Sequence, residues 1–380
     1  MKKSVKGHLI SICLFAAIGV ILGLFMISFV EWQLPEGISS GEKIFRLCAT
    51  LVFLYVAVMI HIVLHEAGHL VFGLMSGYHF SSFRIGSHML MKEDGKLVHR
   101  KLKIAGTGGQ CLMSPPEMVD GKFPVVLYNL GGSIANLVVT AMAIPAFGAI
   151  DKGSIFALFF FLFIAMGAIT GLSNGIPLRT NTIDNDGYNA ISLGKSREAM
   201  RAFWIQMKVN EQLTKGLRVK DMPDEWFEMP ADEDMKNSMV AAVAVMACSR
   251  LMDAHRFEEA DAQIKRILDM ESGVIGLHRS MLMCERIYCE LIGPGRCDRV
   301  AELLDIELKK MMKAMKTMPS VIRLEYALAL LMDKDEAKAA KVLELFEKTA
   351  KKYPYAADIE SERELIEIAR AKAESAHEEE

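Results

Sequence analysis

The chain has no long run of basic residues and no closely spaced pair of cysteines. Its formal net charge is -3 over 380 residues, with 44 Lys and Arg against 47 Asp and Glu. Without a basic block, nothing in the sequence indicates a nucleic-acid partner. The cysteines include no Cys-x-x-Cys pair, which disfavours a metal cluster at Cys284, Cys289 and Cys297 and favours reduced thiols.

The amino-terminal apolar segment lacks the features of a cleaved signal peptide. The apolar run over 8–30 is longer than the roughly 7–15 residues of a signal-peptide core. No small-x-small cleavage motif follows it at Glu31 to Gln33. We therefore predict that residues 8–30 form a retained membrane helix.

What the chain does have is an uneven distribution of apolar and charged residues. Hydrophobic residues make up 52% of the sequence and charged residues 24%, and the two classes are segregated along it. This predicts a membrane domain over 1–190 and a soluble domain over 195–380. Runs near the length of roughly 20 residues that crosses a bilayer predict four spans, at 8–30, 47–70, 125–149 and 153–174.

The distribution of basic residues predicts the orientation in the membrane. Lys2, Lys3 and Lys6 precede the first predicted span, and the segment 78–124 holds more basic than acidic residues. Basic residues favour the cytoplasmic side, and four spans return the chain to the side where it began. We therefore expect an integral, multi-pass protein of a bacterial cell membrane, with both termini in the cytoplasm.

The second predicted span contains the polar motif His65-Glu66-x-x-His69. A hydrophobic helix excludes such groups, because an unpaired polar side chain in hydrocarbon costs several kcal/mol. Positions i and i+4 share a helix face, so His65 and His69 can bind one Zn²⁺, while Glu66 is rotated off that face and can act as the catalytic base. The structural alternative, two satisfied histidines and a glutamate near a helix end, is disfavoured by the cost of inserting all three.

His61 lies on the same face, one turn earlier. Three ligands in a straight i, i+4, i+8 row cannot surround one ion tetrahedrally. We therefore expect His61 to line the pocket or to contact a ligand, and we look for the third ligand elsewhere.

The segment after the fourth predicted span offers that ligand. Pro177 ends the helix and frees backbone carbonyls, which is tolerated only beside protein or a wet cavity. Asp184 and Asp186 both follow, and either carboxylate would complete a two-histidine, one-acid site. Gly187 favours Asp186, because a glycine allows close approach to another element.

These motifs together resemble the site-2 protease family of intramembrane zinc metallopeptidases. The resemblance covers roughly residues 46–190 and rests on HEAGH in a span and on the later Asn-x-x-Pro and Asp-Gly elements. It implies zinc ligation by His65, His69 and Asp186, with Glu66 as catalytic base. The spacing from Asn-x-x-Pro to Asp-Gly is longer here than is usual in the family, which keeps Asp184 open.

A Gly-x-x-x-Asn element, Gly132 to Asn136, also matches the family. The resemblance implies that Asn136 and Asn174 bind the substrate strand or polarise its carbonyl. For Asn136 an equally weighted alternative is a hydrogen bond between helices, beside the small residues that precede it.

Two further regions surround the predicted site. Residues 83–106 alternate enough to predict a hairpin turning at Asp94-Gly95, and the following glycine- and proline-rich stretch predicts no regular element. An edge strand there could hold an unwound substrate, although a plain cytoplasmic hairpin is the alternative. Residues 241–270 and 323–354 each predict an antiparallel helix pair of tetratricopeptide type, which could bind a partner protein, or a helical bundle without a ligand.

The complete prediction is an all-α polytopic membrane protein with a small β-hairpin insertion, followed by an α-helical, tetratricopeptide-like soluble domain. The predicted function is a zinc metalloendopeptidase that cleaves membrane-spanning or membrane-associated peptides near the cytoplasmic face. A transporter or metal-binding receptor is disfavoured by the small number of spans and the lack of repeat symmetry. An inactive scaffold acting through the helical repeats is disfavoured by the intact His-Glu-x-x-His motif.

Overall fold

The computed structural model describes residues 19–20, 23–24, 28, 37–93, 95–104, 107–178 and 184–379. The predicted span at 8–30 therefore lies almost wholly outside the described residues. The chain divides into two compact units. The first, here called the membrane unit, comprises Met1–Tyr78 and Pro124–Lys195, and the second, the sheet-and-helix unit, comprises His79–Phe123 and Ser196–Glu380.

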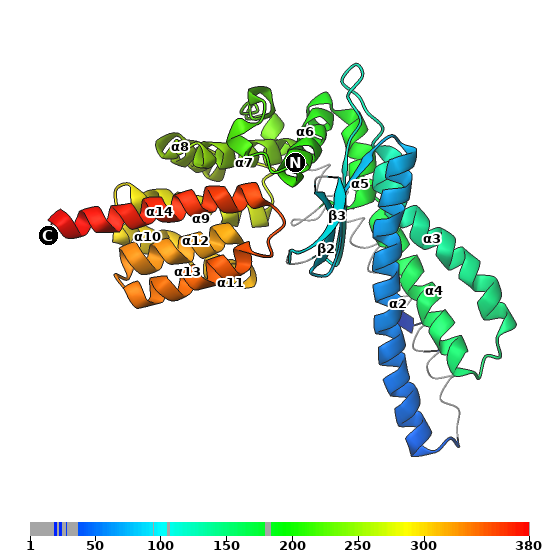
Figure 1. Cartoon of the computed structure of the whole chain (residues 1–380). Coiled ribbons are helices and arrows are strands. Elements are labelled where there is room, and N and C mark those ends of the chain that lie inside the picture. Colours follow the sequence, from blue (N-terminus) through cyan, green and yellow to red (C-terminus); the bar gives the residue numbers. More distant parts are fainter. Residues whose placement is uncertain are drawn as a thin grey trace. The chain divides into compact units, whose positions relative to one another are not determined.

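Three long apolar helices dominate the membrane unit (Figure 1). They are α2 (Ser40–Met75), α3 (Val126–Ala149) and α4 (Ile155–Gly175), and each is long and apolar enough to cross a membrane. They contain or match the predicted spans at 47–70, 125–149 and 153–174. The short helix α5 (Asp186–Ser192) completes the unit.

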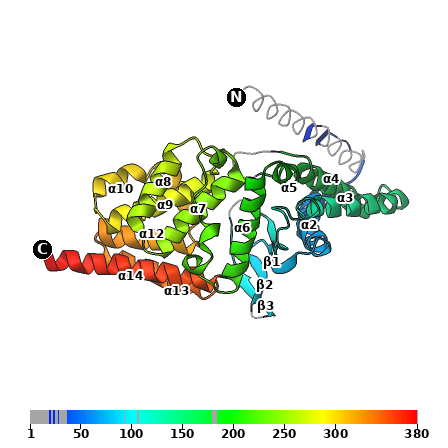
Figure 2. The same ribbon diagram turned by 90° about the horizontal axis from the view of Figure 1, so that it is seen from above.

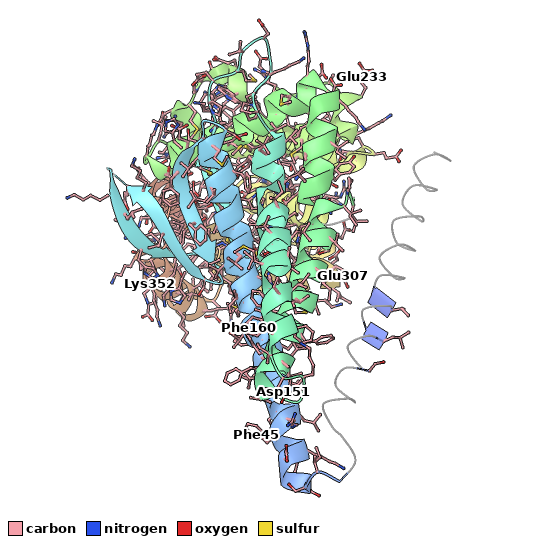
Figure 3. All side chains as sticks on the ribbon, turned by 90° about the vertical axis from the view of Figure 1, so that its right-hand side faces the viewer. Phe45, Asp151, Phe160, Glu233, Glu307 and Lys352 are labelled. Atoms are coloured by element: carbon pink, nitrogen blue, oxygen red, sulfur yellow. The ribbon has the colours of Figure 1, made fainter. Side chains whose placement is uncertain are left out.

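The three helices run alternately up and down. The connection between α3 and α4 is short, whereas residues 76–125, which include the sheet, separate α2 from α3 in the sequence. At one end, Arg46 near the start of α2 donates to the carbonyl of Gly153 over 3.2 Å, in the turn between α3 and α4. Figure 3 shows Asp151 in this turn and Phe45 near it, at the same end of the bundle. Towards the other end, a Cβ on Gly68 would lie 2.3 Å from the carbonyl oxygen of Gly131, so the backbones of α2 and α3 are in direct contact.

An antiparallel sheet of four strands opens the sheet-and-helix unit, where only a hairpin was predicted. The strands are β1 (His79–Ile85), β2 (His88–Glu93), β3 (Lys96–Lys101) and β4 (Gly109–Ser114), in the order β3-β2-β1-β4. The predicted hairpin is the β2–β3 pair, and Gly95 in its turn has φ 78°. The glycine- and proline-rich stretch was wrongly expected to be irregular. It contains β4, because Cys111 and Met113 point into the core and the strand pairs with β1.

Helices make up the rest of this unit. They are α6 (Arg197–Thr214), α7 (Ser238–Asp253), α8 (Phe257–Asp269), α9 (Gly276–Ile292), α10 (Cys297–Leu303), α11 (Ile306–Ala314), α12 (Pro319–Ala327), α13 (Glu336–Ala350) and α14 (Ala356–Glu379). The two predicted helix pairs are found as α7–α8 and α12–α13. Helix lengths range from 7 residues in α10 to 24 in α14, so no regular repeat is evident in the described part, and the tetratricopeptide assignment stays a prediction.

Helix α6 joins the sheet to the other helices of the unit (Figure 2). The indole of Trp204 donates to the carbonyl of Pro116 over 2.9 Å, and Lys208 pairs with Glu117 at 2.8 Å. Residues 79–123 therefore group with the helices that follow residue 195. The predicted division into 1–190 and 195–380 had placed them with the membrane helices.

Candidate metal centre

Three side chains with metal-binding atoms converge at one end of the membrane unit. His65 and His69 lie one turn apart on α2, and Asp186 is the first residue of α5. The Oδ2 atom of Asp186 lies 3.0 Å from Nε2 of His65 and 3.5 Å from Nε2 of His69, and the two nitrogens are 3.1 Å apart. In the described part of the chain, these are the three residues whose ligand atoms all lie within 4.8 Å of one another.

This arrangement fits a zinc ion. Zinc in proteins is usually tetrahedral with bonds of roughly 2.0–2.2 Å, which places neighbouring ligand atoms roughly 3.3–3.6 Å apart. The three separations are near or slightly below that range, as expected for ligands that would move outward a little around an ion. Two imidazoles and one carboxylate are also a donor set that leaves a fourth position open, as catalytic zinc sites require.

Asn185 places Asp186 opposite the histidines. It is the N-cap of α5, and its Oδ1 accepts hydrogen bonds from the backbone of Tyr188 and Leu178, each at 2.9 Å. Its Nδ2 donates to the carbonyls of Ser173 and Ile176 at the end of α4. A role for Asn185 was not predicted from the sequence, although an asparagine directly before the first turn of a helix is a recognised capping signal.

Gly187 makes the close approach that was predicted for it. A Cβ there would lie 2.2 Å from the carbonyl oxygen of Gly175, so only a glycine fits. Asp186 is the carboxylate that faces both histidines, whereas Asp184 does not belong to this group of ligand atoms. Burial by itself would raise the pKa of Asp186. The hydrogen bonds with the two histidines outweigh burial and lower the pKa to about 2, so the side chain is a carboxylate.

The nitrogens that face away from Asp186 also have partners. Nδ1 of His69 lies 2.7 Å from the carbonyl oxygen of Tyr128. Nδ1 of His65 lies 3.3 Å from Nδ2 of Asn136, whose Oδ1 lies 3.2 Å from Nδ1 of His61. Nε2 of His61 lies 2.9 Å from the carbonyl oxygen of Phe163. His61 is thus fully buried behind the ligands, and a row of polar groups links it to His65.

A glycine makes room for one of the ligands. A Cβ on Gly132 would lie 2.6 Å from the imidazole of His65. The first residue of the Gly-x-x-x-Asn element therefore accommodates the ring, and Asn136, one turn later on α3, bonds to it. Both positions act on the same histidine.

The other predicted site residues lie as follows. Glu66 is buried and adjacent to His65, about 100° around the helix axis from it. The amide of Asn174 donates from Nδ2 to the carbonyl of Thr170 over 3.0 Å, within its own helix. The catalytic role of Glu66 and the substrate contacts of Asn136 and Asn174 stay predictions.

The fold and site together indicate a membrane protein with a candidate metal site of two histidines and one carboxylate at the end of its apolar helices. A comparison with family models agrees: the model of peptidase family M50 matches residues 53–355. The chain therefore belongs to this family, the site-2 proteases, which are integral membrane zinc metallopeptidases. No match to a curated protein or to a solved structure was found. The resemblance inferred from HEAGH and Asp-Gly is confirmed.

Proposed function

We propose that the chain is an active zinc endopeptidase that cleaves membrane-spanning or membrane-associated polypeptides. Membership of the M50 family supports the membrane metallopeptidase type. The observation that carries activity is the convergence of His65, His69 and Asp186 on one point, with an intact glutamate beside them.

The roles of the chain's own groups follow from this geometry. His65, His69 and Asp186 would hold the ion, and zinc bound there supplies a Lewis acid that activates water and polarises a peptide carbonyl. Glu66 accepts the proton from the attacking water and later gives it to the leaving amine nitrogen. Glu66 is suited to this work because it is next to a ligand in sequence but does not share the ligands' helix face.

We also propose that the substrate is held by groups that hydrogen-bond to its peptide backbone. Asn174 lies in the last turn of α4, where its amide donates to the carbonyl of Thr170, so it would have to turn to reach a substrate. A substrate helix must unwind before cleavage, and an edge strand can hold the extended chain by main-chain pairing. Strand β3 is an edge of the sheet with mostly exposed side chains, which makes it our candidate for that pairing. We further propose that α6 to α14 bind a protein partner.

We also propose that cleavage takes place near the cytoplasmic face, with both termini in the cytoplasm. The basic residues before the first predicted span and within 78–124 support this orientation. His65 lies 18 residues after Leu47, where the apolar part of α2 begins, and a helix of that length rises about 27 Å. The metal centre would then lie near the inner edge of a hydrocarbon core of about 30 Å.

The test separates metal binding from catalysis. Purified Glu66→Gln protein should hold the same amount of zinc as the wild type and should not cleave a model single-span substrate in liposomes, because glutamate is the base and not a ligand. Zinc content and product formation are measured on the same preparations. Cleavage by Glu66→Gln at the wild-type rate would contradict the proposal.

A further inference from the structure

The row of polar groups behind the metal centre begins at a backbone carbonyl. A carbonyl oxygen can only accept a hydrogen bond, so the contact of 2.9 Å between His61 Nε2 and the oxygen of Phe163 requires a proton on Nε2. A neutral imidazole carries one proton, which leaves Nδ1 of His61 as an acceptor. Both nitrogen contacts that the structure describes for His61 are with uncharged groups, and a second proton would place a buried charge within the membrane helices.

The state of His61 determines the orientation of Asn136. The two ends of an asparagine amide have the same shape, so hydrogen bonding decides which end faces which partner. As placed, Oδ1 faces His61 and Nδ2 faces His65, which would require protons on both nitrogens of His61. Turned by 180°, the amide donates from Nδ2 to His61 and accepts at Oδ1 from His65, and no group needs an additional charge.

The turned amide in turn determines the state of His65. If Nδ1 of His65 donates to Asn136, it keeps its proton, so Nε2, which hydrogen-bonds to Asp186, is the nitrogen that can give up its proton to bind a metal. Nδ1 of His69 likewise carries a proton, because it contacts the carbonyl oxygen of Tyr128, which can only accept a hydrogen bond. Nε2 of His69 is therefore also the nitrogen available to a metal. Metal ligation needs this form of both histidines, since the coordinating nitrogen must carry no proton.

We infer that Phe163, His61 and Asn136 form a hydrogen-bond relay that holds His65 in its metal-binding tautomer. The inference rests on the proposed zinc site, and it makes His61 and Asn136 positioning residues for a ligand. The packing keeps the relay in place: a Cβ on Gly167 would lie 2.4 Å from the His61 ring, so α4 approaches it as closely as a helix can. The ring of Phe163 also lies against it, with centroids 4.3 Å apart.

The first test measures zinc affinity of the purified full-length protein by competition with a chromophoric chelator. His61→Leu and Asn136→Leu should each weaken zinc binding by roughly 10–100-fold, the usual effect of removing a partner of a ligating histidine. The control is Thr140→Val. It removes a buried hydroxyl on α3 that donates to the backbone carbonyl of Asn136 and not to its side chain, so this variant should bind zinc as the wild type does. Unchanged affinity in both leucine variants would overturn the relay.

A double variant makes the test specific. Because His61 acts through Asn136, the double change to leucine should weaken zinc binding no more than Asn136→Leu alone. Losses that multiply would show two independent structural effects and would also overturn the relay. His61→Gln, which keeps one donor and one acceptor, should bind zinc more tightly than His61→Leu, and this comparison remains decisive if the leucine variant folds poorly.

A spectroscopic readout is independent of zinc. In metal-free protein with ¹⁵N-labelled histidine, the ring shifts of His65 should show protonation at Nδ1, and Asn136→Leu should lose this preference. Protonation at Nε2 alone in the wild type, with no proton on Nδ1, would refute the relay. Failure of the proposed function looks different: the wild type would then bind no zinc, or Glu66→Gln would remain active.

Discussion

The two units bury polar groups in opposite ways. In the membrane unit, the row from Phe163 to His65 consists of neutral groups, each bonded to the next, and it ends at the candidate metal ligands. In the sheet-and-helix unit the buried polar groups include charged ones. Arg323, which is fully buried, contacts Glu285 at 2.6 Å and Glu362 at 2.7 Å.

The comparison shows what each environment permits. Among lipid-facing helices a net charge is costly, so neutral hydrogen bonds support the ligands, and charge is confined to the site itself. In a water-exposed unit, buried ion pairs are tolerated when they are well bonded. Around Arg323 the carboxylates outnumber the arginines. Asp358 lines the same cavity of about 210 Å³ as Arg323, Glu285 and Glu362. In the described part of the chain, Asp358 forms no ion pair.

The largest expected effect is in the membrane unit, at its one carboxylate ligand. Asp186→Asn should reduce zinc affinity by orders of magnitude, because a neutral amide is a poor substitute for a charged ligand. Asp184→Asn is the matched control and should bind zinc almost as the wild type does. Zinc content after dialysis against a chelator distinguishes the two, and the reverse order would transfer the ligand role to Asp184.

A smaller effect is expected from breaking the central ion pair of the other unit. Arg323→Met should destabilise the sheet-and-helix unit by roughly 3 kcal/mol, because it leaves the partly buried Glu285 and Glu362 without a counterion. Denaturant unfolding followed by the fluorescence of Trp204 and Trp226, both in this unit, provides the measurement. An unchanged midpoint would show that water already compensates these carboxylates.

The smallest effect should be a gain in stability at Asp358. Burial, together with the charges of Glu362 and Asp253, raises the pKa of Asp358 to about 7, above its unfolded value near 3.8. The folded state therefore binds this proton more tightly, and stability falls as pH rises from about 4 to about 7. Asp358→Asn should remove that loss and stabilise the protein by roughly 2–4 kcal/mol at pH 8, with little change at pH 4.

The control for Asp358→Asn is Glu307→Gln, which removes one negative charge from an exposed side chain of α11 (Figure 3). Its pair with Lys310 is solvated, so the change should cost less than about 1 kcal/mol at either pH. Equal effects of the two variants would attribute the gain to net charge and not to burial.

The sequence predicted the parts of the site that depend on local spacing. Helix periodicity predicted His65, Glu66 and His69. Gly187 favoured Asp186 as the third ligand, because a glycine allows the backbone to approach another element closely. The carbonyls of Tyr128 and Phe163 that contact the histidines could not be predicted. Every residue has a backbone carbonyl, so residue type does not indicate which one will be used.

Other features depended on contacts between distant segments. Strand β4 forms because β1 offers it a partner, although its composition disfavours a strand. The grouping of the sheet with the later helices depends on contacts such as that of Trp204 with Pro116, which are separated by 88 positions in the sequence. Neither kind of contact is encoded in a local pattern.

The length of α2 has a consequence for the lipids around it. Its 36 residues span about 54 Å, whereas the 21 residues of α4 span about 32 Å, close to the hydrocarbon thickness of about 30 Å. Such a mismatch is relieved by tilting the long helix, by extending its ends into the headgroups or by local thickening of the bilayer. Because His65 and His69 lie on that long helix, acyl-chain length and sterol content would alter how deeply the metal centre is immersed.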